Sequence, residues 1–238
     1  MKAMLFAAGL GTRLKPFTDH HPKALVEVNN KTLLEHNIRY LQKAGIYDVM
    51  VNVHHFASQI EDCLYGHDNF GSNVVISDER DAVLETGGGL KKAAPFFAGE
   101  TSFVVMNVDV LTNLDLGKMI EAHANSGAQG TLAVMNRASS RHFLFDKEMV
   151  LSGWRNNNTQ EERISRNVDT LTPFAFSGIQ VLSGEILDNI PFEGKFSLVD
   201  LYLHIARTQV IRGYDHTGNL FIDVGKPESI EKAEYLFQ

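Results

Sequence analysis

The sequence has little of several features that mark whole classes of protein. It contains a single cysteine, Cys63, in 238 residues, so the chain cannot form an internal disulfide. This excludes a disulfide-stapled domain and makes the reducing cytoplasm the expected location. No apolar run approaches the roughly 20 residues of a membrane-spanning helix. The first residues also lack an apolar segment long enough for a secretory signal, so we expect no membrane association.

Basic charge is also scarce. The chain has 22 lysines and arginines against 29 aspartates and glutamates, which gives a formal net charge of −7. This balance argues against nucleic acid as a partner, and an anionic ligand would need positive charge gathered locally. The hydrophobic share of 44% and the charged share of 21% are those of an ordinary globular protein. The length suits one sizeable domain.

Strand and helix patterns alternate along the first 136 residues, which is typical of βαβ units. We therefore predict an α/β fold with a doubly wound, mainly parallel, Rossmann-like sheet. The expected strands cover residues 2–8, 48–55, 73–78, 102–110 and 130–136, and the expected helices cover 32–45, 56–66, 87–97 and 116–127.

From about Arg141 the pattern changes and predicts extra antiparallel strands in the second half. Two strands around a Lys-Glu turn are expected within 142–156, a long strand at 172–182 and a short one within 218–225. Helices are expected near Leu187, at 198–207 and at 226–237, where Pro227 suits the first helical position. The polar segment 156–169 shows no pattern and is interpreted as an exposed loop.

The loop after the first predicted strand, residues 6–25, gathers the positive charge that the rest of the chain lacks. Gly9 and Gly11 permit close backbone approach, and Arg13 and Lys23 add cations where open α/β sheets bind ligands. The dinucleotide fingerprint G-x-G-x-x-G fails, because Leu14 stands at its third glycine, and the P-loop pattern fails as well. An NAD-dependent oxidoreductase and a P-loop ATPase are therefore disfavoured.

This loop resembles the signature of the sugar-1-phosphate nucleotidyltransferase family, G-x-G-T-R-x-x-P-x-T followed by P-K. The matching positions are Gly9, Gly11, Thr12, Arg13, Pro16, Thr18, Pro22 and Lys23. The resemblance implies that the loop, from Ala8 to Thr12, closes over a nucleoside triphosphate. It further implies that Arg13 binds the phosphates and that Lys23 bridges nucleotide and sugar phosphate.

Further positions follow from the same resemblance. The glycine-rich stretch at residues 85–90 would pack on the base and ribose through Thr86, Gly87 and Gly88. The sugar pocket would be lined by Asn107, Ser177 and Gly178, with Asn52 and Glu162 as weaker candidates. The resemblance implies a single nucleotidyltransferase domain, residues 1–238, with a nucleotide-binding half of about 1–136 and a sugar-binding half of about 137–238.

Asp109 and Asp223 each end an apolar strand pattern, where an unpaired carboxylate would be costly to bury. Two such groups beside a triphosphate would hold Mg²⁺, with water and phosphate oxygens completing its ligands. The resemblance assigns both as metal ligands, and Arg13, Lys23 and Asp109 as the catalytic residues. Relatives often carry Gly-Asp at the first site, whereas this chain has Val108 before Asp109.

The implied activity is transfer of a nucleotidyl group from an NTP to a sugar 1-phosphate, with release of pyrophosphate. The short form and the residues LETGGG most resemble the N-acetylmuramate-1-phosphate uridylyltransferases, and mannose-1-phosphate and heptose-1-phosphate guanylyltransferases are the alternative. A non-catalytic nucleotide-sugar sensor is a different class, and it would be expected to lack Arg13, Lys23 or one of the two aspartates. The expected partners are the two substrates, and the chain is expected to be a monomer or homodimer.

Overall fold

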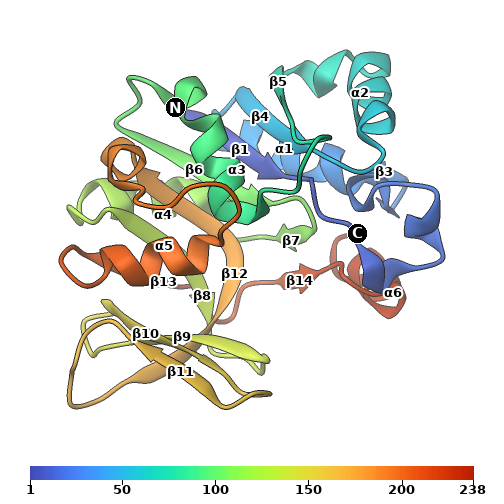
Figure 1. Cartoon of the computed structure of the whole chain (residues 1–238). Coiled ribbons are helices and arrows are strands. Elements are labelled where there is room, and N and C mark those ends of the chain that lie inside the picture. The colour runs from blue at the N-terminus through green and yellow to red at the C-terminus, as the bar shows by residue number, and fades with distance from the viewer.

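The computed structural model describes residues 1–238, and its centre is a large mixed β-sheet (Figure 1). One half of the sheet consists of four parallel strands in the order β6–β1–β4–β5. These are β1 (Lys2–Phe6), β4 (Asp48–Val53), β5 (Asn73–Asp78) and β6 (Ser102–Asn107). Parallel neighbours need a crossover connection. The crossovers contain α1 (Leu33–Lys43), α2 (Ala57–Gly66) and α3 (Glu85–Ala93).

The other half of the sheet is built around the long strand β12 (Thr172–Ser183), which runs antiparallel to β6. On its other side β12 pairs with β8 (Gly130–Met135), and β8 pairs with β13 (Ile211–Asp215). The start of β12 pairs instead with β9 (Arg141–Phe145), which is extended by β10 (Leu151–Asn156) and β11 (Glu161–Ile164). The predicted mainly parallel sheet with antiparallel additions is confirmed.

Helices cover both faces of the sheet. One apolar cluster joins the strands to α1, α2 and α4 (Leu116–Ala124), and a second joins them to α3 and α5 (Leu198–Ile205). Neighbouring residues of β1 enter opposite clusters, because side chains alternate along a strand: Leu5 packs in the first and Met4 in the second. A third, smaller cluster packs the opening loop against α6 (Pro227–Leu236).

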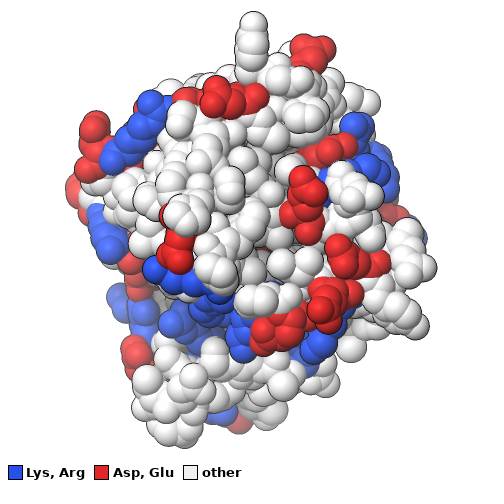
Figure 2. All heavy atoms as spheres, turned by 90° about the vertical axis from the view of Figure 1, so that its right-hand side faces the viewer, with Lys and Arg blue, Asp and Glu red and all other residues white.

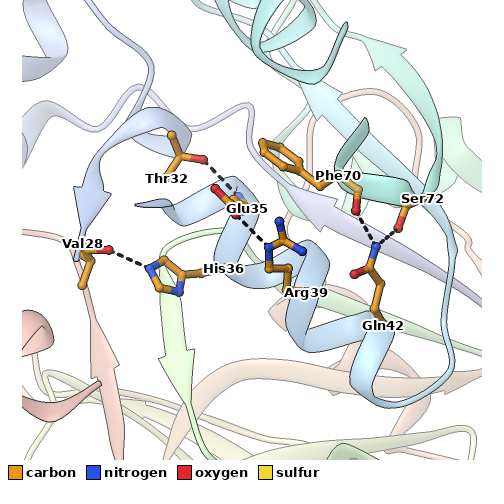
Figure 3. A network of polar contacts seen from close by, with 8 residues as sticks. All are labelled: Val28, Thr32, Glu35, His36, Arg39, Gln42, Phe70 and Ser72. Atoms are coloured by element: carbon orange, nitrogen blue, oxygen red, sulfur yellow. Dashed lines mark hydrogen bonds and ion pairs between the residues drawn. The ribbon is translucent and has the colours of Figure 1, made fainter. Parts of the chain in front are cut away.

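Helix α1 is tied to its surroundings at both ends (Figure 3). At its start the Thr32 hydroxyl accepts a hydrogen bond from the Glu35 backbone N–H at 3.1 Å, a standard helix cap. Near its end the Gln42 amide donates to the Phe70 carbonyl at 2.8 Å and to the Ser72 hydroxyl at 2.9 Å. The helix therefore gives a fixed support to the loops beside it.

Three local expectations differ from the structure. Part of the predicted loop 156–169 forms the edge strand β11, which pairs only with β10 and carries an ion pair across the two strands, Arg155 to Glu162 at 2.5 Å. Neither face of β11 is buried, so its residues show no alternating apolar pattern from which a strand could be predicted. The helix expected near Leu187 is a 3₁₀-helix, Gly184–Asn189, and β13 was not expected.

The remaining short elements lie mostly in loops. They are β2 (Glu27–Val28), β3 (Lys31–Thr32), β7 (Val110–Thr112) and β14 (Phe221–Asp223), with 3₁₀ turns at Thr12–Leu14, Phe17–Asp19, Lys23–Leu25, Asp68–Gly71 and Ala94–Phe97. None of the helices combines the length and the apolar character that crossing a bilayer requires.

Candidate active site

A cleft of about 460 Å³ opens at the carboxyl ends of the four parallel strands. Each strand contributes a wall residue at this edge: Phe6 from β1, Asn52 from β4, Glu79 just after β5 and Asn107 from β6. Open α/β sheets bind ligands at this edge, because the crossover loops leave a crevice there. The cleft is therefore where the fold itself favours a ligand.

The opening loop forms one wall of this cleft and has a fixed shape. The backbone N–H groups of Ala7 and Ala8 donate to the Asn52 side-chain oxygen at 2.7 and 3.3 Å. Gly11 has a φ of +62°, and a Cβ there would lie 2.8 Å from the Thr18 methyl carbon, so the position requires glycine. A Cβ at Gly9 would meet nothing within 4 Å, which leaves the backbone there open.

Most of the predicted nucleotide-binding residues line the cleft. The lining residues that were predicted are Ala8, Gly9, Gly11, Thr12, Arg13, Lys23, Thr86, Asn107 and Asp109, together with the weaker candidate Asn52. Figure 2 views the molecule from the right-hand side of Figure 1, the side of α6 and β14, and shows lysine and arginine side chains gathered around a hollow in the lower half of that face. An acidic chain thus gathers positive charge around this hollow, while aspartates and glutamates are spread over the rest of the face.

Asp109 and Asp223 are far apart in sequence and are brought together by the pairing of two short strands. Strand β14 lies antiparallel to β7, so that Asp223 stands opposite Val110, and the Val224 N–H donates to the Asp109 carbonyl at 2.9 Å. The Lys23 ammonium forms ion pairs with both carboxylates, a close one with Asp109 and a 3.8 Å one with Asp223. Lys23 of the opening loop therefore lies close to both Asp109, which follows β6, and Asp223, which ends β14.

Buried Asn37 of α1 supports this point from behind. Its amide donates to the Val108 carbonyl at 2.7 Å and to the Leu33 carbonyl of its own helix at 2.8 Å. The backbone directly before Asp109 is therefore fixed to a helix, although the residue there is valine and not the glycine that relatives often carry.

The electrostatics of the carboxylate pair favour a cation between them. Burial raises the pKa of Asp223, and so does the nearby negative charge of Asp109, while Lys23, Arg13 and Arg137 lower it. No group of three or more histidine, cysteine or acidic side chains forms a closed metal cage. Two carboxylates suit instead a hard divalent ion that takes its other ligands from water and phosphate, so the residues fit Mg²⁺.

The glycine-rich stretch lies differently from the prediction. The glycines are within the first turns of α3, and Gly87 and Gly88 do not line the cleft. A Cβ at Gly87 would lie 2.3 Å from the Phe196 ring, and one at Gly88 would lie 2.3 Å from the Gly194 carbonyl. Both backbone N–H groups point to the Phe196 carbonyl, at 2.9 and 3.3 Å. Close packing of two chain segments thus accounts for these glycines. Of the three predicted residues only Thr86 reaches the cleft, next to Glu85.

Of the predicted sugar-binding residues, too, only some line the cleft. Asn107 lines the cleft, whereas Ser177 is 1% exposed and its hydroxyl lies 2.8 Å from the His216 Nε2 atom. Gly178 has a φ of +73°, and a Cβ there would lie 2.9 Å from the Asn107 amide nitrogen. Gly178 therefore packs against Asn107, Ser177 is buried beside His216, and neither lines the cleft. The weaker candidate Glu162 pairs with Arg155 on the antiparallel extension.

Glu79 is a cleft residue that the sequence interpretation missed. It is 2% exposed, one of its carboxylate oxygens accepts from the Asn52 amide at 2.8 Å, and the other has no partner. A buried oxygen without a partner is costly unless a ligand supplies a hydrogen. The signal that pointed to Asp109, an acidic residue directly after an apolar strand, would also have found Glu79.

The chain is similar to known proteins along its whole length. The family model for nucleotidyl transferases matches residues 2–146. An N-acetylmuramate alpha-1-phosphate uridylyltransferase of Caulobacter vibrioides is 33% identical, with 98% of this chain and 95% of that protein covered. A mannose-1-phosphate guanyltransferase of Gibberella zeae is 26% identical over 100% of this chain and 64% of its own. The crystal structure of HddC from Yersinia pseudotuberculosis complexed with GMP-PN has a TM-score of 0.78 at 25% identity, covering 100% of this chain and 99% of that one.

Proposed function

The chain belongs to the nucleotidyl transferase family, and from this premise we propose that it transfers a uridylyl group from UTP to N-acetylmuramate 1-phosphate. The observation that carries the proposal is that Arg13, Lys23 and Asp109 line one cleft. Asp223 lies beside it, 3.8 Å from the Lys23 ammonium. The choice of substrates rests on the 33% identity with the Caulobacter enzyme, which extends over nearly the full length of both chains.

Arg13 and Lys23 bind the triphosphate in this proposal, and the open backbone at Gly9 lets its phosphates come close. An oxygen of the sugar phosphate attacks the α-phosphorus, and the bond to the bridging α–β oxygen breaks. Pyrophosphate leaves with the electron pair of that bond. The attacking group is already an anion, so no general base is needed, and catalysis consists of positioning and charge neutralisation.

The proposed cofactor is Mg²⁺, held by Asp109 and Asp223. When bound, it would neutralise charge on the phosphates during transfer. Lys23 contributes in two ways, because it balances the paired carboxylates in the free protein and its ammonium can turn to a phosphate oxygen when the triphosphate arrives.

Glu79 supports a restricted choice of base. Its free oxygen is an acceptor, and in this proposal it accepts from the ring N–H at the centre of a base's Watson–Crick edge. Uracil, thymine and guanine carry this ring N–H, whereas adenine and cytosine have a lone pair at that ring nitrogen and offer only an exocyclic amino group. The same observation keeps guanylyl transfer to mannose 1-phosphate or a heptose 1-phosphate as the second candidate.

A pyrophosphate-release screen tests the proposal. It combines the four common NTPs and dTTP with N-acetylmuramate, mannose, glucose and heptose 1-phosphates. We expect the highest kcat/KM with UTP and N-acetylmuramate 1-phosphate. A maximum with GTP and mannose or heptose 1-phosphate would favour the second candidate, and pyrophosphate from no pair would reject the proposed activity.

A further inference from the structure

Arg137 joins three strands near Asp223, outside the set of residues that line the cleft. It follows β8, and its backbone carbonyl lies 3.1 Å from the His142 Nε2 atom of β9. Its guanidinium donates from Nη2 to the Phe176 carbonyl of β12 at 2.9 Å and lies over the ring of Phe221 of β14, 4.7 Å from the ring centre. These contacts fix the guanidinium next to the strand that carries Asp223.

The positive charge of Arg137 has no counter-ion in contact. The side chain is half-buried, its hydrogen bonds go to neutral backbone carbonyls, and its Nε–H has no partner. Burial lowers the pKa of Arg137, and the only carboxylate whose charge opposes this effect is Asp223, which lies beyond ion-pair distance. Desolvating a cation without a paired anion costs free energy. A bound anion would recover that cost.

Cations flank Asp223 from two directions. On the side of the opening loop, the Lys23 ammonium lies 3.8 Å from an Asp223 oxygen. The Arg13 guanidinium is also near, because a Cβ built on Gly225 would lie 2.6 Å from an Asp223 oxygen and 2.9 Å from the guanidinium. Arg137 approaches from β12 and β14 instead. A triphosphate on Arg13 and Lys23 would leave Arg137 free for a second anion.

The surroundings of Arg137 match a sugar phosphate. Phe176, whose carbonyl accepts the Arg137 hydrogen bond, lies two residues before Gly178, and Gly178 packs against the cleft residue Asn107. We propose that Arg137 binds the phosphate of the sugar 1-phosphate and aligns it for attack. This inference rests on the proposed function, because it needs a second, phosphate-bearing substrate. A planar guanidinium suits this role, since it can hold two phosphate oxygens at once.

Kinetics of three variants test the proposal. Arg137→Met removes the charge, Arg137→Lys keeps it without the planar fork, and Arg163→Met is the matched control, because Arg163 pairs with Asp200 at 2.8 Å and lies 6.0 Å from the Trp154 ring centre. We expect Arg137→Met to raise the KM for sugar 1-phosphate at least about tenfold and the KM for UTP less than about twofold. The KM of Arg137→Lys for sugar 1-phosphate should lie between those of wild type and Arg137→Met. Both KM values of the control Arg163→Met should match wild type.

Equal changes in both KM values, or a change in kcat alone, would overturn the proposal and leave Arg137 a structural role. Thermal unfolding of each variant shows whether the fold is kept. If Arg137→Met does not fold, the test uses Arg137→Lys and compares its change in KM for sugar 1-phosphate with its change in KM for UTP. Wild-type KM values for both substrates in that variant would also overturn the proposal.

Calorimetric titration of inorganic phosphate separates this inference from the proposed activity. Protein saturated with a non-hydrolysable UTP analogue should bind phosphate at least about tenfold more tightly in wild type and Arg163→Met than in Arg137→Met. If the analogue does not bind, the proposed function fails, and phosphate titrated alone still tests Arg137. Equal phosphate affinity in wild type and Arg137→Met would contradict the inference in either case.

Discussion

Replacing Asp109 by asparagine removes one charge from the centre of the site and keeps the side-chain shape. Asp109 is 16% exposed and its partner Lys23 is 11% exposed, so the pair is largely shielded from water. Isolating a buried charge costs about 3–5 kcal/mol. Here Lys23 keeps a second carboxylate, Asp223, at 3.8 Å. We therefore expect a loss of only about 1–2 kcal/mol, which lowers Tm by about 2–8 °C.

Turnover should fall far more than stability. Loss of one proposed metal ligand and of the charge that places Lys23 should lower kcat at least about a hundredfold. The assay is pyrophosphate release across a Mg²⁺ titration, with calorimetric Tm on the same samples. Asp188→Asn, at an exposed aspartate outside the cleft, is the control. A kcat within threefold of wild type at saturating Mg²⁺ would refute the reasoning.

Three further predictions concern packing, base choice and pH. Gly88→Ala should destabilise the protein by about 1–3 kcal/mol in chemical unfolding, because its Cβ would lie 2.3 Å from the Gly194 carbonyl. Gly9→Ala should leave stability unchanged and weaken UTP binding, since a Cβ there meets nothing within 4 Å. Equal effects of the two substitutions on stability would disprove the packing explanation. Glu79→Gln should keep the fold and raise the KM for UTP at least about fivefold, because a weaker neutral acceptor replaces the carboxylate, and an unchanged KM would show that Glu79 does not contact the base. His216 is 4% exposed, and burial lowers its pKa to about 4, so its contribution to stability is complete above about pH 6.5 and is lost as the pH falls toward 4. His216→Asn should therefore flatten the fall in unfolding free energy over that range by up to about 3 kcal/mol, and an unchanged slope would mean that another group causes it.

The parts of the fold that local patterns determine were predictable. Strand β5 has the bounds that its apolar run gave, and β1, β4 and β6 differ only at their ends. The cations of the opening loop and the aspartate after β6 were also predictable, because their position relative to a parallel strand decides where they point.

Features that depend on distant contacts were not predictable. Gly87 and Gly88 are required by Phe196 and Gly194, which follow about a hundred residues later in the chain, and nothing local distinguishes this from a ligand platform. Strand β11 has no buried face to impose an alternating pattern. Arg137 stands after β8 among polar residues, and only the fold brings it to Asp223.

In the proposed function, the opening loop and the two aspartates bind one and the same triphosphate. The direct measurement is a crystal structure with a non-hydrolysable UTP analogue and Mn²⁺, with the metal located by anomalous scattering. We expect one manganese ion bound by Asp109 and Asp223 and by the triphosphate, whose phosphates also contact Arg13 and Lys23. A triphosphate bound away from Arg13, or a metal bound away from either aspartate, would contradict the account.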